Sequence, residues 1–264
     1  MARFERGGLQ LAYDDNPPAG EEAGVILLVH GFAASRAESW KRLGWYPVLA
    51  RAGYRVIAAD LRGHGESDKP HDPAAYARSE LAADLVALLD QLAVGRADLL
   101  GYSMGAGLAL GLAIDHPQRV GNLIVGGLGA RSLEARPLGD GGMTLAEAMR
   151  APNAEAIADA TLRGFRRFAE QEGADREALA ACSEGGGRNL TPAMLAQLAT
   201  PTLVVAGAFD QIAGDPQPLA DAIPGAKCVT LPGCDHFTAT PHALFKSAVI
   251  DFLEGWMDEM PPSP

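Results

Sequence analysis

Short apolar runs recur along the chain and are separated by longer stretches with helical periodicity. The strongest run covers residues 24–29, Gly-Val-Ile-Leu-Leu-Val. An apolar run without polar alternation is typical of a strand that is buried on both faces of a parallel sheet. Ahead of it, Gly7 and Gly8 separate two short strands and indicate a hairpin. Further strands are predicted at residues 55–60, 96–100, 122–126, 202–206 and 227–231.

Helices are indicated in the intervals between these strands. One helical stretch reaches residue 52, with Gly53 as its C-cap. Another begins with Ser79 as its N-cap, a third includes residues 106–114, and the last covers residues 241–256. The apolar face predicted for the last helix comprises Leu244, Phe245, Ala248, Val249, Phe252 and Leu253. The alternation predicts an α/β fold, with a mostly parallel central sheet and helices on both faces.

The alternation stops between about residues 128 and 200, where only helices are indicated. Thr144 and Glu147 have the spacing of a capping box, which marks a helix start. Because such helices are inserted between two core strands, we expect them to form a lid over the carboxyl edge of the sheet, where open α/β sheets bind ligands. The four helices begin near Thr144, Asn153, Asp175 and Thr191. The predicted organisation is a core in two parts, 1–127 and 201–264, with a helical lid at 128–200.

The charge of the chain excludes several kinds of partner. The 264 residues carry a formal net charge of −11, so binding to nucleic acid or to an anionic membrane surface is not expected. The only local group of arginines, Arg163, Arg166 and Arg167, lies among acidic residues and is interpreted as a solvated helix face. The expected partner is therefore a small molecule, and the oligomeric state stays open.

The first residues and the cysteines indicate the compartment. Residues 1–6 lack the apolar segment of a signal peptide, and no apolar run is long enough to cross a bilayer. We therefore expect a cytoplasmic protein. Cys182, Cys228 and Cys234 are odd in number and have no CxxC spacing, so neither a disulfide framework nor a metal site is expected.

The segment Gly101-Tyr102-Ser103-Met104-Gly105 follows a predicted strand and precedes a predicted helix. A G-x-S-x-G sequence in this context is typical of a sharp strand-to-helix turn that exposes the serine hydroxyl. A side chain at either glycine would collide with the facing strand or helix. Ser103 is therefore the candidate nucleophile.

A serine hydroxyl needs a base, and the base needs an orienting carboxylate. Among the six histidines, His236 lies in the loop after the last predicted strand, from which it can reach the carboxyl edge of the sheet. Asp210 follows the strand at 202–206 and emerges at the same edge. Asp215 and Asp235 are its competitors, although Asp235 cannot easily turn back to the ring of its neighbour.

Four motifs together resemble the α/β-hydrolase superfamily, and in particular its lid-bearing serine esterase-type members. They are the segment from His30 to Phe32, the segment from Asp60 to Ser67, the serine turn, and the chain order serine, aspartate, histidine. The resemblance covers essentially the whole chain. Haloalkane dehalogenases and epoxide hydrolases of this superfamily use an aspartate nucleophile, so the serine at position 103 excludes that branch.

The resemblance implies a role for each matching residue. Ser103 is the nucleophile, His236 the general base and then acid, and Asp210 the residue that orients the imidazole. The backbone N–H groups of Phe32 and Met104 form the oxyanion hole. The side chains expected to line an apolar acyl pocket are those of Phe32, Tyr102, Phe209 and Phe237, and those expected to brace the site are His30, Asp60, Arg62 and His64.

The expected function is hydrolysis of a small carboxylic ester through an acyl-enzyme intermediate, with no metal or organic cofactor. The same triad also serves carbon–carbon bond hydrolases, lactonases and cofactor-free perhydrolases, and these alternatives stay open. A non-enzymatic alternative is a ligand-sensing receptor with this fold. Acyl-chain length and the identity of the alcohol depend on the lid, for which the sequence gives no geometry.

Overall fold

The computed structural model describes residues 2–134, 138, 142–186 and 190–258. Its centre is an eight-stranded sheet with the order β1-β2-β4-β3-β5-β6-β7-β8. Strands β3 to β8 are parallel, whereas β2 pairs antiparallel with both β1 and β4. The strands are β1 (Ala2–Arg6), β2 (Leu9–Asn16), β3 (Gly24–Val29), β4 (Tyr54–Ala59), β5 (Ala97–Tyr102), β6 (Val120–Gly126), β7 (Thr202–Gly207) and β8 (Lys227–Leu231).

Each predicted strand is present, with ends that differ by no more than two or three residues from the predicted ones. Strand β3 shows why apolar runs identify the centre of the sheet. Ile26 and Leu28 pack into one hydrophobic cluster, and Leu27 and Val29 pack into another on the opposite face. Alternate residues of a strand point to opposite faces, so a strand that is covered on both sides has no position for a polar side chain.

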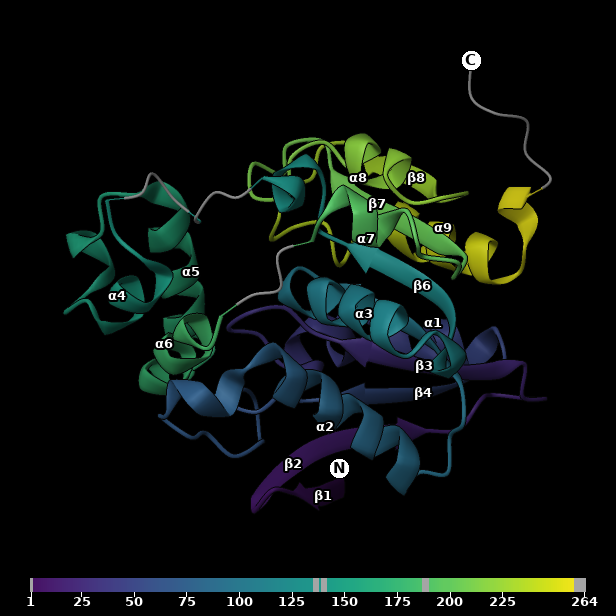
Figure 1. Cartoon of the computed structure of the whole chain (residues 1–264), viewed down its shortest axis with the longest axis horizontal. Helices are drawn as coiled ribbons and strands as arrows, with labels where there is room; N and C mark the ends of the chain where they lie inside the picture. Colours follow the sequence, from purple (N-terminus) through teal and green to yellow (C-terminus); the bar gives the residue numbers. More distant parts are fainter. Residues whose placement is uncertain (1, 135–137, 139–141, 187–189, 259–264) are drawn as a thin grey trace.

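Helices cover both faces of the sheet, as predicted (Figure 1). Helices α1 (Trp45–Arg51) and α9 (Ala243–Leu253) pack on the face of Ile26 and Leu28. Helices α2 (Arg78–Gln91), α3 (Met104–Asp115) and α8 (Gln217–Asp221) pack on the other face. No helix in the described part of the chain is long and apolar enough to cross a membrane.

Three sequence predictions about helices are wrong: the continuity of the first helical stretch, the start of the second helix and the apolar face of the last one. The stretch predicted up to residue 52 is divided into η1 (Ala37–Lys41) and α1, because Gly44 adopts a left-handed conformation with φ of 74° between them. Ser79 lies in the first turn of α2, whose N-cap is Ala77, and no side chain caps this helix. Leu244 of α9 is 48% exposed, whereas Phe245 on the same helix is fully buried.

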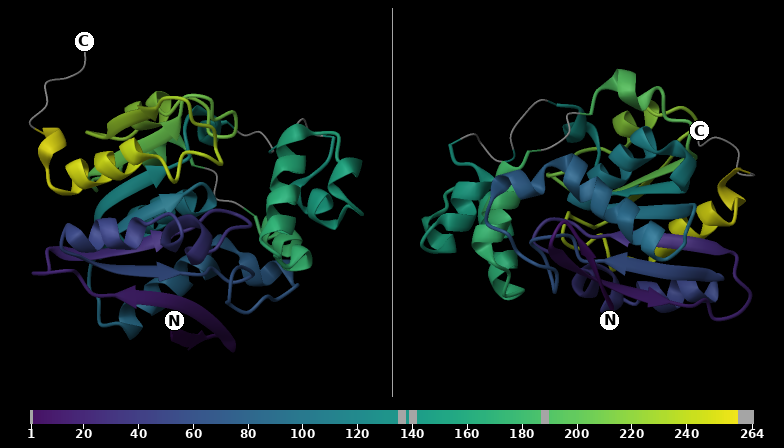
Figure 2. Two further views of the ribbon diagram at one scale, coloured as in Figure 1. Left: turned by 180° about the vertical axis from the view of Figure 1, so that it is seen from behind. Right: turned by 60° about the horizontal axis from the view of Figure 1, so that its bottom comes forward.

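The inserted helices between β6 and β7 are α4 (Leu145–Arg150), α5 (Ala160–Gln171), α6 (Arg176–Glu184) and α7 (Pro192–Leu195). The predicted capping box at Thr144 and Glu147 is present, and Asp175 and Thr191 cap the helices that follow them. The helix predicted from residue 153 to 173 is divided, because Asp159 caps α5 after a separate short turn. Figures 1 and 2 show α4, α5 and α6 as a group beside the carboxyl ends of the strands.

Arg166 of α5 corrects the interpretation of the arginine group. Its side chain is 2% exposed, and its guanidinium donates to the carbonyl oxygens of Ala148 and Ala151 and pairs with Glu170. A buried guanidinium needs hydrogen-bonded or charged partners, which Nη1 and Nη2 have here, whereas Nε has none among the described residues. Arg167 is exposed, so only part of the group forms a solvated face.

Candidate active site

Ser103 occupies a strained turn between β5 and α3. Its φ of 54° and ψ of −117° lie in a region that side chains rarely adopt. A Cβ atom at Gly101 would overlap the carbonyl oxygen of Gly105, and one at Gly105 would overlap the carbonyl oxygen of Val29. The two glycines are therefore required by close backbone approach, as the sequence predicts. Such strain is found where surrounding structure fixes a functional group.

Three side chains from distant segments form a hydrogen-bonded chain beside this turn. The Ser103 hydroxyl donates to Nε2 of His236 over 2.9 Å, and Nδ1 of His236 donates to Oδ2 of Asp210 over 2.8 Å. Asp210 follows β7 and His236 follows β8. Both loops emerge at the carboxyl edge of the sheet, where β5 also ends. The structure thus brings together the three residues that the sequence analysis selected.

The carboxylate of Asp210 is fixed in one orientation. It is 3% exposed, and Oδ1 accepts the backbone N–H groups of Ile212 and Ala213, which leaves Oδ2 for the imidazole. The carboxylates of Asp215 and Asp235 instead accept N–H groups of the residues that follow them. In the described part of the chain, the side chains of Asp215 and Asp235 do not contact the imidazole of His236. Asp210 is therefore the carboxylate of this site.

Tyr102 holds the loop that carries His236. Its hydroxyl donates to the backbone carbonyl oxygen of His236 over 2.6 Å. Burial raises the pKa of Tyr102 well above its ordinary value, so the hydroxyl stays protonated and keeps this bond. The ring of Tyr102 also packs 5.4 Å from the imidazole, measured between centroids. Tyr102 therefore positions the histidine as well as lining the site.

The loop after β3 packs directly against the serine turn. A Cβ atom at Gly31 would lie 3.3 Å from the carbonyl oxygen of Tyr102 and 3.4 Å from Cβ of Ser103. Phe32 is the next residue of this loop, and Met104 is the first residue of α3. The N–H groups of the first helical turn have no partner within the helix. Two backbone segments that adjoin Ser103 thus carry the N–H groups predicted for the oxyanion hole, and that role stays a prediction.

His30 ties this loop to the segment after β4. Its Nε2 accepts the backbone N–H of Leu61 over 3.1 Å, and its Nδ1 lies 2.8 Å from the carbonyl oxygen of Gly31. Burial lowers the pKa of His30 to about 4, and burial together with His30 lowers the pKa of His64 to about 3. Both rings are neutral at physiological pH. Their contacts are those of bracing residues.

The turn from Asp60 to Ser67 is buried and hydrogen-bonded, as the sequence analysis expects. Asp60 accepts the backbone N–H groups of Arg36 and Glu66 over 2.7 and 2.8 Å, and it also pairs with the Arg36 guanidinium. Arg62 forms two hydrogen bonds of 2.7 and 2.6 Å with Asp84 of α2. These paired charges join the turn to the loop after β3 and to α2.

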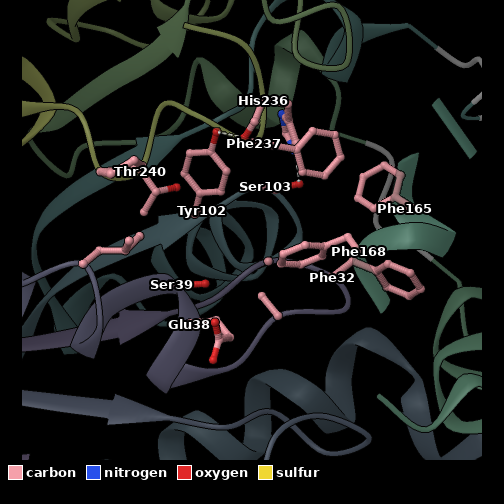
Figure 3. Close-up of a pocket in the computed structure, with 14 residues that line it drawn as sticks. Phe32, Glu38, Ser39, Tyr102, Ser103, Phe165, Phe168, His236, Phe237 and Thr240 are labelled. Carbon is pink, nitrogen blue, oxygen red and sulfur yellow. Dashed lines mark hydrogen bonds between the residues drawn. The ribbon is translucent and has the colours of Figure 1, made fainter. Parts of the chain in front are cut away.

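A cavity of about 230 Å³ opens on Ser103 and His236 (Figure 3). Four phenylalanine rings, here named the aromatic wall, line one part of it: Phe32, Phe165, Phe168 and Phe237. The rings of Phe165 and Phe237 lie 5.5 Å apart between centroids, and that of Phe165 lies 6.2 Å from the imidazole of His236. Edge-to-face packing at these distances is favourable and makes a rigid apolar surface.

Tyr102, Phe32 and Phe237 line the cavity, as predicted, but Phe209 does not. The Phe209 side chain is 64% exposed, because the residue before Asp210 points away from the site. The sequence analysis missed Phe165 and Phe168, which α5 brings to the cavity. Their spacing of three residues on a strongly amphipathic helix was the only available signal, and it is shared with ordinary core positions. It also missed Glu38 and Ser39 of η1.

The described residues offer no group of three or more His, Cys, Asp or Glu side chains that could hold a metal ion. The three cysteines are free thiols. Burial raises the pKa of Cys182 to about 11, so this thiol is protonated at physiological pH.

Comparison with known proteins agrees with this architecture. A family model described as the alpha/beta hydrolase fold matches residues 24–140. A crystal structure of a hydrolase from Pseudomonas aeruginosa PA01 superimposes with a TM-score of 0.76 and 28% identity, over 96% of this chain and 97% of that chain.

Two curated relatives differ in how much of their length is matched. Epoxide hydrolase B of Mycobacterium tuberculosis is 36% identical over 140 residues, which is 51% of this chain and only 38% of that protein. The putative carbamate hydrolase RutD of Variovorax paradoxus is 32% identical in an alignment of 272 positions, which covers 93% of this chain and 96% of that protein. On this full-length similarity and the matching fold, the chain belongs to the α/β hydrolase family.

Proposed function

We propose that this protein is a serine hydrolase that cleaves small carboxylic esters through an acyl-enzyme intermediate. The observation that carries the proposal is the continuous hydrogen-bonded chain from the Ser103 hydroxyl through His236 to Asp210. A serine hydroxyl is a weak nucleophile unless a base removes its proton during the attack. Nε2 of His236 lies 2.9 Å from Oγ of Ser103, so it can act as this base. The adjoining cavity is mostly apolar and below the size usual for drug-sized ligands, which supports a small substrate.

The reaction follows in two halves. Oγ of Ser103 attacks the ester carbonyl carbon while Nε2 of His236 takes the hydroxyl proton, and the carbonyl oxygen becomes an oxyanion. The C–O bond to the alcohol then breaks, and His236 gives its proton to the departing alcohol oxygen. In the second half a water molecule gives a proton to His236 and attacks the acyl carbon, and the proton then returns to Ser103 as the acid leaves. Each step uses only groups of this chain, the ester and water.

Backbone N–H groups of Phe32 and Met104 would stabilise the oxyanion. Backbone donors are fixed before the charge develops, and the loss of one such donor typically lowers turnover by about 10² to 10³. Close packing between Gly31 and the serine turn supports a fixed geometry there. Asp210 would keep the proton of the imidazole on Nδ1 and stabilise the imidazolium that forms.

The inserted helices would act as the lid of this site. Their part in the proposal rests on Phe165 and Phe168, which α5 contributes to the cavity next to Ser103. An apolar cover excludes water from the acyl-enzyme and strengthens electrostatic interactions inside. Residues 128–200 are therefore proposed as one part of the chain that selects the substrate.

A second candidate reaction is hydrolysis of a carbamate. Similarity to the putative carbamate hydrolase over nearly the whole of both chains favours it. The same nucleophile and base would serve, with a carbamoyl in place of an acyl intermediate. A higher kcat/KM for a p-nitrophenyl carbamate than for p-nitrophenyl acetate would favour this candidate over ester cleavage.

The test is active-site labelling combined with an ester assay. A fluorophosphonate probe should label Ser103, and the protein should hydrolyse p-nitrophenyl acetate with repeated turnover. Ser103→Ala should abolish both signals. Labelling and turnover that persist in Ser103→Ala would contradict the proposal, and release that stops after one acyl group per chain would favour a ligand sensor. A vinylogous diketone and a lactone, assayed in parallel, compare the alternative bond types.

A further inference from the structure

The active-site cavity has a polar end in addition to the aromatic wall. Glu38 and Ser39, neighbours in η1, line it there (Figure 3). In this view they lie on the side away from His236 and Phe237, with Ser103 between the two groups. An otherwise apolar cavity usually places its few polar side chains where they orient a ligand.

The Ser39 hydroxyl is available to a ligand. Ser39 is 9% exposed and lines the cavity, and its backbone N–H donates to the carbonyl oxygen of Ser35. A hydroxyl can both donate and accept.

Glu38 adds an acceptor next to this hydroxyl. Oε1 of Glu38 pairs with Arg42, and Arg42 also lies 3.8 Å from the carboxylate of Glu172 at the end of α5. Burial and the neighbouring Glu38 carboxylate raise the pKa of Glu172. A carboxylate can accept several hydrogen bonds, so the pairing with Arg42 does not exhaust Glu38. This end of the cavity therefore favours a group that donates hydrogen bonds, and it disfavours an anion.

The position of His236 decides which part of an ester reaches this end. His236 must give a proton to the departing alcohol oxygen, so the alcohol lies on the side of the imidazole. Phe165 and Phe237 are the rings that pack nearest the imidazole from the aromatic wall. The alcohol then contacts apolar surface, and the acyl part extends in the other direction, toward Ser39 and Glu38.

We propose that the substrate is an ester of a short acid whose acyl part carries a hydrogen-bond donor, and that Ser39 and Glu38 bind this donor. The inference rests on the proposed ester hydrolysis at Ser103 and names the class of substrate for that site. A hydroxyl and an ammonium group share the required chemistry, since both donate to a carboxylate.

The test compares four p-nitrophenyl esters with acyl groups of similar size: butanoate, 3-hydroxypropanoate, 3-aminopropanoate and the monoester of succinate. A hydrogen bond to a charged group is worth enough to give a preference of about tenfold or more. We therefore expect kcat/KM for the better of the two donor-bearing esters to exceed that for butanoate at least about tenfold, and the succinate ester to be the poorest substrate. The donor-bearing ester with the higher kcat/KM shows whether the donor in the acyl part is a hydroxyl or an ammonium group.

Two variants assign the preference to its residues. Glu38→Gln and Ser39→Ala should each reduce the ratio of donor ester to butanoate to less than about threefold, because each removes one partner of the donor. Glu155→Gln removes an exposed carboxylate of the inserted helices that is outside the cavity, and it should keep the wild-type ratio. Circular dichroism and thermal unfolding establish that each variant is folded.

The outcomes separate this inference from the proposed function. Equal kcat/KM values for butanoate and both donor esters, or the highest value for the succinate ester, would overturn the inference while ester hydrolysis stands. A wild-type ratio retained in both folded variants would also overturn it. Absence of hydrolysis with all four esters would instead contradict the proposed function itself.

Discussion

The carboxyl edge of the sheet and the inserted helices both contribute to the cavity, but they are built differently. At the sheet edge, Ser103 is held by backbone in contact with backbone. Gly101 and Gly105 leave no room for a side chain, and Gly31 leaves little. The inserted helices reach the same cavity through the rings of Phe165 and Phe168, which pack against other rings.

This difference separates chemistry from selection. A change at the sheet edge moves atoms that take part in the proposed reaction. A misplacement of about 1 Å there can lower the reaction rate by about 10²-fold. A change in the ring contacts alters the shape of the cavity and leaves the hydrogen-bonded chain of Ser103, His236 and Asp210 in place. We therefore expect large losses in kcat from the first region and smaller, substrate-dependent changes from the second.

Asp210→Asn should have the largest effect. Oδ1 accepts two backbone N–H groups, so the amide must turn its NH₂ group toward His236. Nδ1 would then have to accept, and the proton would move to Nε2, which could no longer take the serine proton. Turnover of p-nitrophenyl acetate should fall by about 10⁴ with the fold intact. Asp215→Asn is the matched control, and full activity in Asp210→Asn would show that the carboxylate is not needed.

Gly105→Ala should destabilise the sheet edge itself. The added methyl group meets the carbonyl oxygens of Val29 and His30, which belong to the backbone and cannot move aside cheaply. We expect a loss of about 3 kcal/mol or more in the free energy of unfolding, measured with urea. Gly107→Ala, two residues further along α3, meets nothing within 4 Å and should raise stability by about 0.5–1 kcal/mol. Equal stability of the two variants would contradict the packing argument.

The buried histidines predict a loss of stability in mild acid. Because folding lowers the pKa of His30 from 6.5 to about 4, the unfolded chain binds more protons than the native protein between these values. Stability is therefore highest above pH 6.5 and falls as the pH drops toward 4. His30 alone should account for about 2 kcal/mol between pH 7.5 and pH 5. Urea unfolding at the two pH values measures this difference, which should shrink in His30→Gln; an unchanged difference would exclude His30 as its source.

Phe165→Ala should have the smallest effect on catalysis. The ring contacts Phe32, Phe237 and His236, so its removal opens the aromatic wall. We expect kcat/KM for p-nitrophenyl acetate to fall about tenfold, because the substrate loses part of one apolar contact surface. The fluorophosphonate probe should still label Ser103. Phe209→Ala is the control, since that ring is largely exposed and outside the cavity. A loss of 10³ or more in Phe165→Ala would mean that the inserted helices also hold the catalytic groups.

The features that the sequence predicts correctly have local causes. The strands follow from apolar runs, and the turn at Ser103 follows from two glycines whose side chains could not be accommodated. His236 and Asp210 could be selected because parallel strands present their following loops at one edge. In each case the signal lies within a few residues of the feature.

The features that the sequence missed depend on tertiary contacts. Arginine is usually a surface residue, yet Arg166 is buried, and the carbonyl oxygens of Ala148 and Ala151 at the end of α4 accept hydrogen bonds from its guanidinium. Phe209 adjoins Asp210 but faces solvent, whereas Phe165 is 45 positions away in the sequence and lines the cavity. Proximity along the chain is a poor guide to a cavity, because a cavity is lined by whichever elements the fold brings there.

The position of the inserted helices in the chain has an evolutionary consequence. They form one continuous stretch between β6 and β7, and Ser103 precedes this stretch while Asp210 and His236 follow it. Recombination that exchanged the stretch as a single cassette would replace Phe165 and Phe168 together and leave Ser103, His236 and Asp210 with their own loops. Descendants of one ancestor could acquire new substrates in this way without rebuilding the reaction centre.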